Sequence, residues 1–456
     1  MVIRHINFDN NIETNWFELL QQYTTQYFDN LPLKKGFSFP PSNLEESIIN
    51  ATCIGEATSF EKIISFVANF LDTNGLQAAS GNHCGYIPGG GLFENAIGNF
   101  ITSVGNYYSG VSFASLGAVA LENEVLNWVC DIVGYDKNAK GNITSGGSLA
   151  NLTALTVAKK AKEITSKNIE NCCIYLGEHT HHSVLKALKV SGLDEMRIRK
   201  IELNKFLQLD IDKLKQQIEE DLSAGFNPAI IVSSAGTTNA GAIDDLSAIN
   251  ELSNKHSLWH HCDAAYGGFF VLTDAGQKQL KGLAQAHSIT LDPHKGLFQS
   301  YGSGIVLVKN GELLANTFSE EADYMRDTLS DTFSPSDLSI ELSRPFRALP
   351  LWVSLKAHGV AKFSEALEEK LQLTAYAYQS LKKMRFIIGP KPQLSVIIFR
   401  LDDNDKTQRL LKSIHNTCSV FLSSTHSFSH LWIRVAILSH RTSFNEINTL
   451  IKFLSK

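Results

Sequence analysis

Between about residues 140 and 310, short apolar runs alternate with helical stretches, and this alternation limits the possible folds more than any other feature. The apolar runs are NCCIYLG, AIIVSSAG, SLWHHCDA and GIVLVK, and the stretches between them include IDKLKQQIEEDL and DDLSAINELSNKH. Strand, helix and strand in this order predict an α/β fold with a mainly parallel sheet covered by helices. Such sheets bind ligands at the carboxyl ends of their strands.

The two flanking parts of the chain have other patterns. Residues 1 to about 80 are expected to be helical, because SFEKIISFVANFL places apolar residues at helical spacing. From about residue 345, the strand-like run LWIRVAIL and the final helix SFNEINTLIKFL indicate a smaller α+β unit. A chain of 456 residues suits two or three packed units. We therefore expect an N-terminal helical segment over 1–85, a large domain over 86–343 and a small C-terminal domain over 344–456.

Composition excludes several classes of protein. Hydrophobic residues make up 43% and charged residues 19%, as in globular proteins. The net charge is −5 and there is no long Lys/Arg run, so a nucleic acid is not expected as a partner. No apolar run approaches the ~18 residues that span a membrane, and the N-terminus lacks the apolar region of a signal peptide. Seven cysteines without a CxxC pair indicate reduced thiols and no zinc site. We expect a cytoplasmic protein.

The first motif with chemical meaning is TSGGSLANLTAL, residues 144–155. Gly146 and Gly147 can adopt backbone conformations closed to other residues, and Ser148 adds a hydroxyl where a helix begins. A glycine-rich turn at a helix N-terminus binds phosphate through free N–H groups and the helix dipole. An ordinary capped connection between a strand and a helix would have the same pattern.

Two further motifs follow predicted strands. In WHHCDAAYGGFF an apolar run ends at Asp263, where a buried carboxylate requires a cationic or hydrogen-bonding partner. In SITLDPHKGLF, Lys295 lies just past a strand, and a lysine shielded from water there can react with an aldehyde. Taken singly, Asp263 fits the common pattern of an N-cap aspartate after a strand, and a solvated loop lysine is the favoured interpretation of Lys295.

A fourth motif, EHTHHSVLKALKVSGL at 178–193, has three histidines within four residues. Zinc binding is one interpretation, but HxHH has poor geometry for one ion. A ring stacked on a ligand, a proton donor and simple packing are the other interpretations.

Together the four motifs predict a site for pyridoxal 5'-phosphate (PLP). The lysine binds the aldehyde, the carboxylate holds the pyridine nitrogen protonated, and the glycines and serine bind phosphate.

The sequence resembles the PLP-dependent group II amino-acid decarboxylases, which include the aromatic L-amino-acid and glutamate decarboxylases. The resemblance rests on GYIPGGG, TSGGSLANLTAL, HHSVLKAL, SSAGTTNAGAIDD, HHCDAAYGGFF, SITLDPHK, SRPFRALPLW and LWIRVAIL, in family order from about 80 to 440. It implies the aspartate-aminotransferase-like fold (fold type I) with a seven-stranded type of sheet. It also implies an intertwined homodimer, in which the active site lies at the subunit boundary and the N-terminal segment embraces the partner.

The resemblance also implies roles for individual residues. Lys295 would form the Schiff base, and His181, the first residue of HHSV, would stack on the ring. The remaining cofactor residues would be Gly147 and Ser148 at the phosphate, His294 near it, Asp263 at the pyridine nitrogen, Ala265 under the ring and Ser234 near the ring. Tyr86 in GYIP and Arg434 in LWIRVAI would contact the substrate, with Arg434 near its carboxylate.

The implied reaction is decarboxylation of an L-amino acid, with an aromatic one slightly favoured, through an external aldimine to CO₂ and an amine. Two features depart from the family. Residues 325–342 contain no tyrosine where the family has one that donates a proton to Cα; Phe333 lies near that place and Tyr324 just before the stretch. The glycine-rich GYIPGGGLF opens the substrate pocket. His181 could donate the proton instead, or the product could be an aldehyde formed by oxidation.

Two alternatives stay open at this point. One is another fold-type-I reaction, such as transamination or carbon–carbon cleavage, because the cofactor residues would look much the same. The other is a non-catalytic binding or scaffold protein that has kept the fold, with Lys295 idle.

Overall fold

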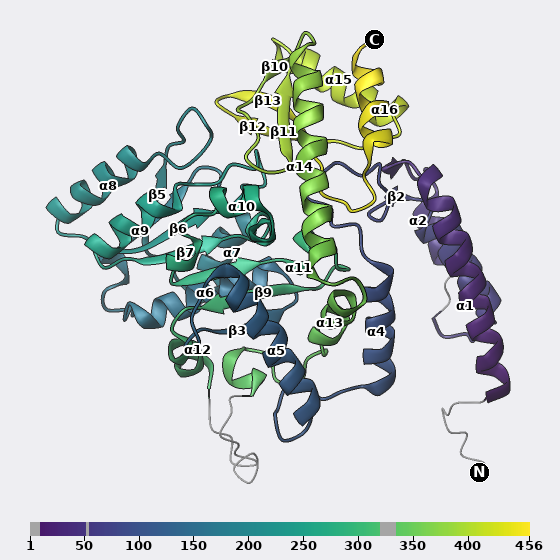
Figure 1. Ribbon diagram of the computed structural model, residues 1–456, viewed down its shortest axis with the longest axis horizontal. Coiled ribbons are helices and arrows are strands. Elements are labelled where there is room, and N and C mark those ends of the chain that lie inside the picture. Colours follow the sequence, from purple (N-terminus) through teal and green to yellow (C-terminus); the bar gives the residue numbers. More distant parts are fainter. Residues whose placement is uncertain (1–9, 52–53, 320–333) are drawn as a thin grey trace.

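The structure is a computed structural model, which describes residues 10–51, 54–319 and 334–456. Its centre is a seven-stranded sheet with helices on both faces (Figure 1). β9 runs antiparallel to both of its neighbours, and the other six strands share one direction, which confirms the mainly parallel sheet. The spatial order is β3 (Lys140–Thr144), β9 (Gly304–Val308), β8 (Ser288–Leu291), β7 (Trp259–Asp263), β6 (Asn227–Ser234), β4 (Cys172–Gly177) and β5 (Arg197–Ile201).

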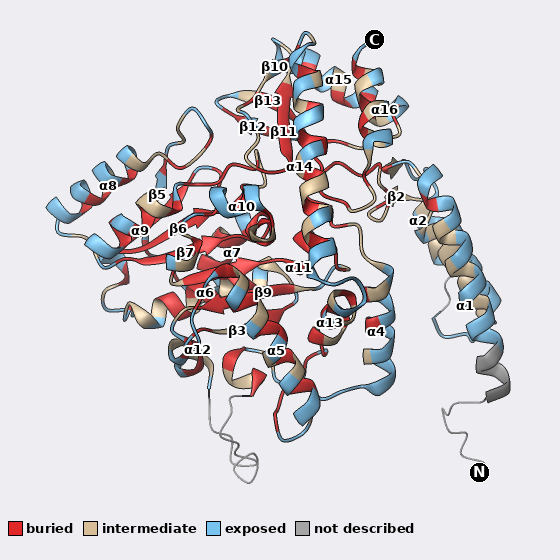
Figure 2. Cartoon of the chain, in the orientation of Figure 1, coloured by how far each residue is buried: buried red, intermediate tan, exposed pale blue. Residues whose placement is uncertain are grey.

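The inner strands are apolar throughout because helices bury both of their faces. In β4 every residue is buried. Ile174 and Leu176 pack with the helices of one face, and Cys173 and Tyr175 pack with those of the other. Figure 2 shows the resulting buried layer between two sets of helices that are exposed on their outer sides.

The helices follow the strands as the alternating pattern predicts. One face of the sheet carries α6 (Gly147–Ala161), α7 (His182–Ser191) and α12 (Gly311–Phe318). The other face carries α5 (Leu116–Val133), α8 (Ile211–Ser223) and α9 (Leu246–Lys255). Two short helices, α10 (Asp274–Gln279) and α11 (Pro293–Gly296), lie in the connections after β7 and β8.

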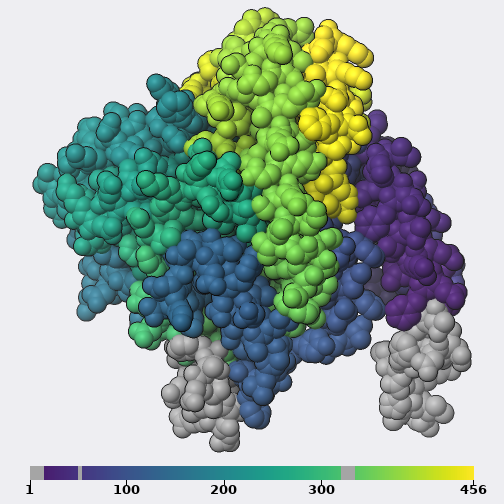
Figure 3. All heavy atoms as spheres, viewed as in Figure 1, coloured from purple at the N-terminus to yellow at the C-terminus, as the bar shows by residue number. Residues whose placement is uncertain are grey.

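The C-terminal part forms the smaller α+β unit that the sequence predicts. Its antiparallel sheet has the order β10 (Ile387–Ile388), β11 (Val396–Arg400), β13 (His430–Ala436) and β12 (Ser423–Ser427). Its helices are α13 (Ala348–His358), α14 (Val360–Lys382), α15 (Asn404–Thr417) and α16 (Phe444–Leu454). Figure 3 shows this part capping the large domain, with α14 extending from it down along the large domain.

The N-terminal part is helical, as expected, and lies along one side of the molecule (Figure 1). It contains α1 (Asn10–Asn30), α2 (Leu44–Ala51), α3 (Phe60–Phe66) and a short β1 (Phe37–Ser38) paired with β2 (Gly75–Leu76). The next helix, α4 (Phe93–Gly105), begins after the predicted segment 1–85. The last residues of the N-terminal part bond to the small domain: Phe421 N donates to Asn82 O and Ala436 N to Cys84 O, both at 2.8 Å. Among the described helices, none is long and apolar enough to cross a membrane.

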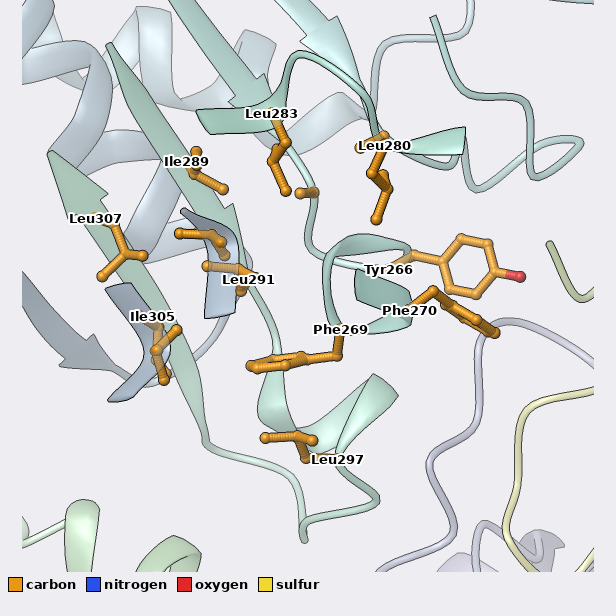
Figure 4. Packing of buried hydrophobic residues seen from close by; sticks show 14 of the residues in the cluster. Tyr266, Phe269, Phe270, Leu280, Leu283, Ile289, Leu291, Leu297, Ile305 and Leu307 are labelled. Carbon is orange, nitrogen blue, oxygen red and sulfur yellow. The ribbon is translucent and has the colours of Figure 1, made fainter. Parts of the chain in front are cut away.

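A buried cluster holds the turn that follows β8. Figure 4 shows the ring of Phe269 between the side chains of Leu291 and Leu297, all three of them fully buried. Gly296 packs so closely that a Cβ there would come within 2.8 Å of Phe269 Cβ. The turn between Leu291 and Leu297 is therefore anchored on both sides, and it carries Lys295.

Candidate active site

A cavity of about 430 Å³ opens at the carboxyl edge of the sheet. The parallel strands end there, so residues far apart in the sequence converge. All eight cofactor residues predicted from the sequence line this cavity: Gly147 and Ser148 after β3, His181 after β4, Ser234 at the end of β6, Asp263 and Ala265 at and after β7, and His294 and Lys295 after β8.

Lys295 lies on α11, whose first residue is Pro293; the fixed backbone angle of proline suits the first turn of a helix. Its Nζ lies 2.9 Å from Oδ2 of Asp292, and its side chain is 20% exposed. Burial disfavours the charge on Lys295, but Asp292 and then Asp263 outweigh it and raise the pKa of the lysine. The amine is therefore charged in the cofactor-free protein and must lose a proton before it can attack an aldehyde.

Asp263 ends β7 and is 7% exposed. Its Oδ2 accepts a hydrogen bond from Nδ2 of Asn151 at 2.9 Å, and its Oδ1 accepts one from the backbone N–H of Ala265 at 3.1 Å. Two donors thus fix the orientation of a buried carboxylate that faces the cavity, which suits a partner for a protonated pyridine nitrogen.

Asn151 and His261 support Asp263, and sequence reasoning missed both. The Oδ1 of Asn151 is 3.0 Å from Nε2 of His261, whose Nδ1 is 2.9 Å from Oγ of Ser288. Burial lowers the pKa of His261 to about 4, so the ring is neutral. Two signals could have revealed them: His261 shares a strand face with Asp263, and Asn151 lies one helical turn after Gly147.

His181 is the N-cap of α7, where its Nδ1 accepts a hydrogen bond from the backbone N–H of Ser183 at 3.3 Å. Burial lowers the pKa of His181, and the charge of Asp263 offsets this only in part. The neutral ring therefore carries its proton on Nε2. A neutral, planar ring suits stacking on a cofactor, and it becomes a proton donor once it has taken up a second proton.

Gly147 opens α6, a helix of 15 residues whose free N–H groups border the cavity. A Cβ on Gly147 would lie 2.9 Å from Oδ2 of Asp292 and 3.3 Å from Cβ of Ala265. The preceding Gly146 has φ 150°, a conformation that side chains disfavour. His294 lies beside this cradle, with Nδ1 2.5 Å from the carbonyl oxygen of Ser303. The residues present fit the phosphate of PLP.

The structure does not bring Tyr86 and Arg434 to the walls of this cavity. Arg434 is buried and donates to the backbone oxygens of Asn239 (3.0 Å) and Tyr86 (3.3 Å) and to Oγ of Ser423 (2.6 Å). Burial lowers its pKa to about 10. The Tyr86 side chain is mostly exposed. Their roles toward the substrate stay predictions.

Two other sequence questions touch this site. Within the described ranges, no three His, Cys, Asp or Glu side chains group closely enough to hold a metal ion. Tyr324, Phe333 and the first half of the stretch 325–342 lie outside the described residues.

The sheet, the strand-end lysine and carboxylate and the glycine cradle define an α/β site for PLP of fold type I. A family model for the pyridoxal-dependent decarboxylase conserved domain matches residues 41–402, and the chain belongs to that family. It is a PLP-dependent amino-acid decarboxylase, so the scaffold and the non-decarboxylating alternatives are set aside.

Three similar proteins illustrate the range of the family. An aromatic-L-amino-acid decarboxylase of Bacillus atrophaeus is 35% identical over 79% of this chain and 78% of its own length. A phenylacetaldehyde synthase of Petunia hybrida is 26% identical over 94% of this chain and 91% of its own. The crystal structure of Oryza sativa TDC with PLP and tryptamine superimposes with a TM-score of 0.92 at 19% identity and covers 99% of both chains, which confirms the fold.

Proposed function

We propose that the enzyme decarboxylates an aromatic L-amino acid and releases the amine. One observation carries this choice. A second cavity of about 350 Å³ adjoins the cofactor cavity and shares His294 and Tyr301 with it. Its wall is mainly aromatic and aliphatic, with Tyr27, Phe28, Leu71, Leu76, Leu92 and Phe93. A substrate bonded to the cofactor could extend an uncharged ring into this space.

The charged groups of the second cavity already have partners. Arg441 donates to the backbone oxygens of Gly90 at 2.6 Å, Gly91 at 3.0 Å and Ala79 at 3.2 Å. Asp72 accepts from the hydroxyl of Tyr23 at 2.9 Å. An acidic or basic substrate side chain would have to break these hydrogen bonds before it could pair with Arg441 or Asp72, whereas an aromatic ring would leave them intact.

In this proposal PLP, when bound, supplies the electron sink for the bond that breaks at Cα. The chain supplies the rest. Asp263 would hold the pyridine nitrogen protonated, Lys295 would bind the aldehyde carbon, and His181 would cover the ring. After CO₂ leaves, Cα needs a proton. We propose His181 as the donor among the residues that line the cofactor cavity. Its neutral ring would first take up a second proton, donate as the imidazolium and so return to the neutral form.

We also propose a homodimer as the active unit. Phe93, Ile97, Phe100, Ile101 and Val104 form an exposed apolar stripe at helical spacing on α4. Phe17 and Leu20 of α1 are also exposed, and Phe17 packs edge-on against Phe100. A continuous exposed apolar stripe marks a surface for contact with another protein, and it supports the predicted role of the N-terminal segment toward the partner. The cytoplasmic location stays a prediction.

An amino-acid panel tests the proposed reaction. Phenylalanine, tyrosine, tryptophan, glutamate and 2,4-diaminobutyrate are assayed in parallel for CO₂, amine, aldehyde and peroxide. We expect kcat/KM for an aromatic substrate to exceed that for the charged ones by roughly 10- to 100-fold, because a hydrogen bond to a charged group contributes about 1.5–3 kcal/mol and a charged substrate would have to break such bonds. We also expect amine to equal CO₂. Equal use of glutamate would contradict the substrate class. Stoichiometric aldehyde and peroxide would contradict amine release and favour the oxidative alternative that the missing tyrosine suggests.

A further inference from the structure

A third cavity, of about 630 Å³, lies on the seam between the β5 edge of the large sheet and the small sheet. Its walls come from the connection between β5 and α8, from the connection between β10 and β11, and from the β12–β13 hairpin. Among the described residues, none lines both this cavity and either of the two at the active site. The helices α1 and α4 lie on the other side of the molecule (Figure 1). Neither the reaction nor the proposed subunit contact explains this cavity.

The floor and walls of the cavity are held in place by the protein itself. Leu207, before α8, and Trp432, on β13, pack into one buried cluster. The amides of Gln208 and Gln393 hold the same residue: Nε2 of Gln208 donates to the backbone oxygen of Ile243 at 2.5 Å, and Oε1 of Gln393 accepts from its N–H at 2.9 Å. The cavity is therefore preformed, and a ligand does not have to order its walls.

Two phenylalanine rings at this cavity are left open to solvent. Phe206 and Phe428 line it and are each 53% exposed. Phe428 has φ 48° and Ser429 has φ 63°, in the two-residue turn between β12 and β13, and Leu207 has φ 64°. Asparagine and glycine are the usual residues in such conformations, and strained bulky residues cluster at sites that bind ligands. The backbone thus holds apolar side chains at this cavity against a local strain, which contact with a bound ring would explain.

The charge of the cavity is positive. Lys205 and Lys391 line it, both are exposed, and neither takes part in an ion pair within the described ranges. Its described lining contains no aspartate, glutamate or arginine. Two cations beside an apolar floor attract a small anion. Arginine forks and helix N-termini are the groups best matched to phosphate, and the described lining has neither, so a carboxylate is the anion that fits.

We propose that this cavity is a second ligand site, which binds a small aromatic carboxylate without an amino group. The ring lies against Phe206 and Phe428, and the carboxylate pairs with Lys205 and Lys391. The amino-acid substrate and the amine product are disfavoured here, because their ammonium group finds no acidic partner in the described lining. The site therefore recognises an aromatic acid that the enzyme neither consumes nor makes.

Calorimetry with indole-3-acetate as the probe tests the site on the PLP-loaded enzyme. We expect Lys205→Gln/Lys391→Gln to bind the probe roughly 10-fold more weakly than the wild type, because each exposed ion pair contributes modestly. Lys213→Gln/Lys215→Gln is the matched control, since these two lysines of α8 are equally exposed but do not line the cavity. Both double variants should turn over substrate like the wild type. Equal affinity of the two double variants for the probe would overturn the proposal.

Phe428→Asn tests the ring contact separately, because asparagine tolerates the left-handed conformation of that position. We expect it to bind indole-3-acetate roughly 5-fold or more weakly, as an aromatic contact is lost; unchanged affinity would refute the contact. Acetate and tryptamine test the ligand class, since the first lacks the ring and the second carries an ammonium group. We expect neither to displace the probe from this site. Complete displacement by tryptamine, or a wild type that binds no indole-3-acetate at millimolar concentration, would overturn the proposal.

Discussion

At the scale of the residue, the site depends on how Asp263 is held. Its carboxylate must face the pyridine nitrogen, and Asn151 supplies the side-chain hydrogen bond that directs it. His261 in turn directs Asn151, since its Nε2–H can bond only to the amide oxygen and so points the NH₂ group at Asp263. The order His261, Asn151, Asp263 therefore determines the orientation of the group that tunes the cofactor.

Asn151→Ala tests this arrangement. It leaves Asp263 with its backbone donor alone, and we expect the affinity for PLP to fall by roughly 10- to 100-fold, since a hydrogen bond to a charged group contributes about 1.5–3 kcal/mol. Equilibrium titration followed by cofactor absorbance measures this. Asn254→Ala on the exposed side of α9 is the matched control and should leave the affinity unchanged. An affinity of Asn151→Ala equal to that of the control would refute the orienting role.

The sequence alone predicted those cavity residues that have a distinctive chemistry of their own. A lysine, an aspartate and a glycine turn after successive strands suffice to predict a PLP site, because strand ends converge. Asn151, His261 and Asp292 could not be predicted in the same way. Asn151 and His261 contact each other although they are more than 100 positions apart in the sequence, and Asp292 lies beside the glycine turn at the start of α6. The spacing of residues along the chain does not reveal such contacts.

At the scale of the element, α6 determines where the phosphate can bind. Its first turn approaches Asp292 and Ala265 so closely that a side chain at position 147 would clash with them, and only glycine fits there. Gly147→Ala would push the start of the helix away from α11. We expect the protein to fold, with PLP bound at least roughly 10-fold more weakly, because small shifts of oriented donors remove much of their contribution.

Gly117→Ala on α5 is the control for that change, since nothing lies within 4 Å of a Cβ there. It should bind PLP like the wild type and gain slightly in stability, as alanine is the better helix former. Unchanged PLP affinity in Gly147→Ala would show that the start of α6 does not form the phosphate site.

The elements themselves were largely predictable. The apolar runs became β4, β6, β7 and β9, and the helical stretches became α8 and α9, because a parallel sheet buried on both faces needs continuous apolar strands. The sequence reasoning placed the strand GIVLVK in a mainly parallel sheet but did not anticipate the reversed direction of β9. Direction depends on the connection from α11 to Gly304, and the apolar run alone does not carry it.

At the scale of the whole molecule, the exposed stripe on α4 predicts the subunit contact. Val104→Glu places a charge in the stripe, and in a symmetric dimer it does so twice. We expect the dimer dissociation constant to rise by roughly 100-fold or more, because burying unpaired charges costs several kcal/mol. Light scattering after size-exclusion chromatography at micromolar concentration measures this. Val190→Glu, equally exposed at the end of α7, is the control; identical masses for both variants would place the interface elsewhere.

The buried histidines predict how stability depends on pH. Burial lowers the pKa of His260 to about 3 and that of His261 to about 4, whereas the unfolded chain binds these protons near pH 6.5. The unfolded state therefore binds more protons below pH 6.5, so stability falls as the pH falls. At pH 5 each histidine would lower the free energy of unfolding by about 2 kcal/mol relative to pH 8. Calorimetry should show a falling Tm from pH 7 to 5; a constant Tm would contradict this.

The central claim is that Lys295 meets the cofactor aldehyde at the carboxyl edge of this sheet. Borohydride reduction of the PLP-loaded enzyme, followed by digestion and mass spectrometry, tests it most directly. Reduction makes the lysine–cofactor bond permanent, and the account predicts one phosphopyridoxyl group per chain, attached to Lys295 in SITLDPHKGLF. The label should be absent from Lys295→Ala. A label on another lysine, or equal labelling of the variant, would contradict the account.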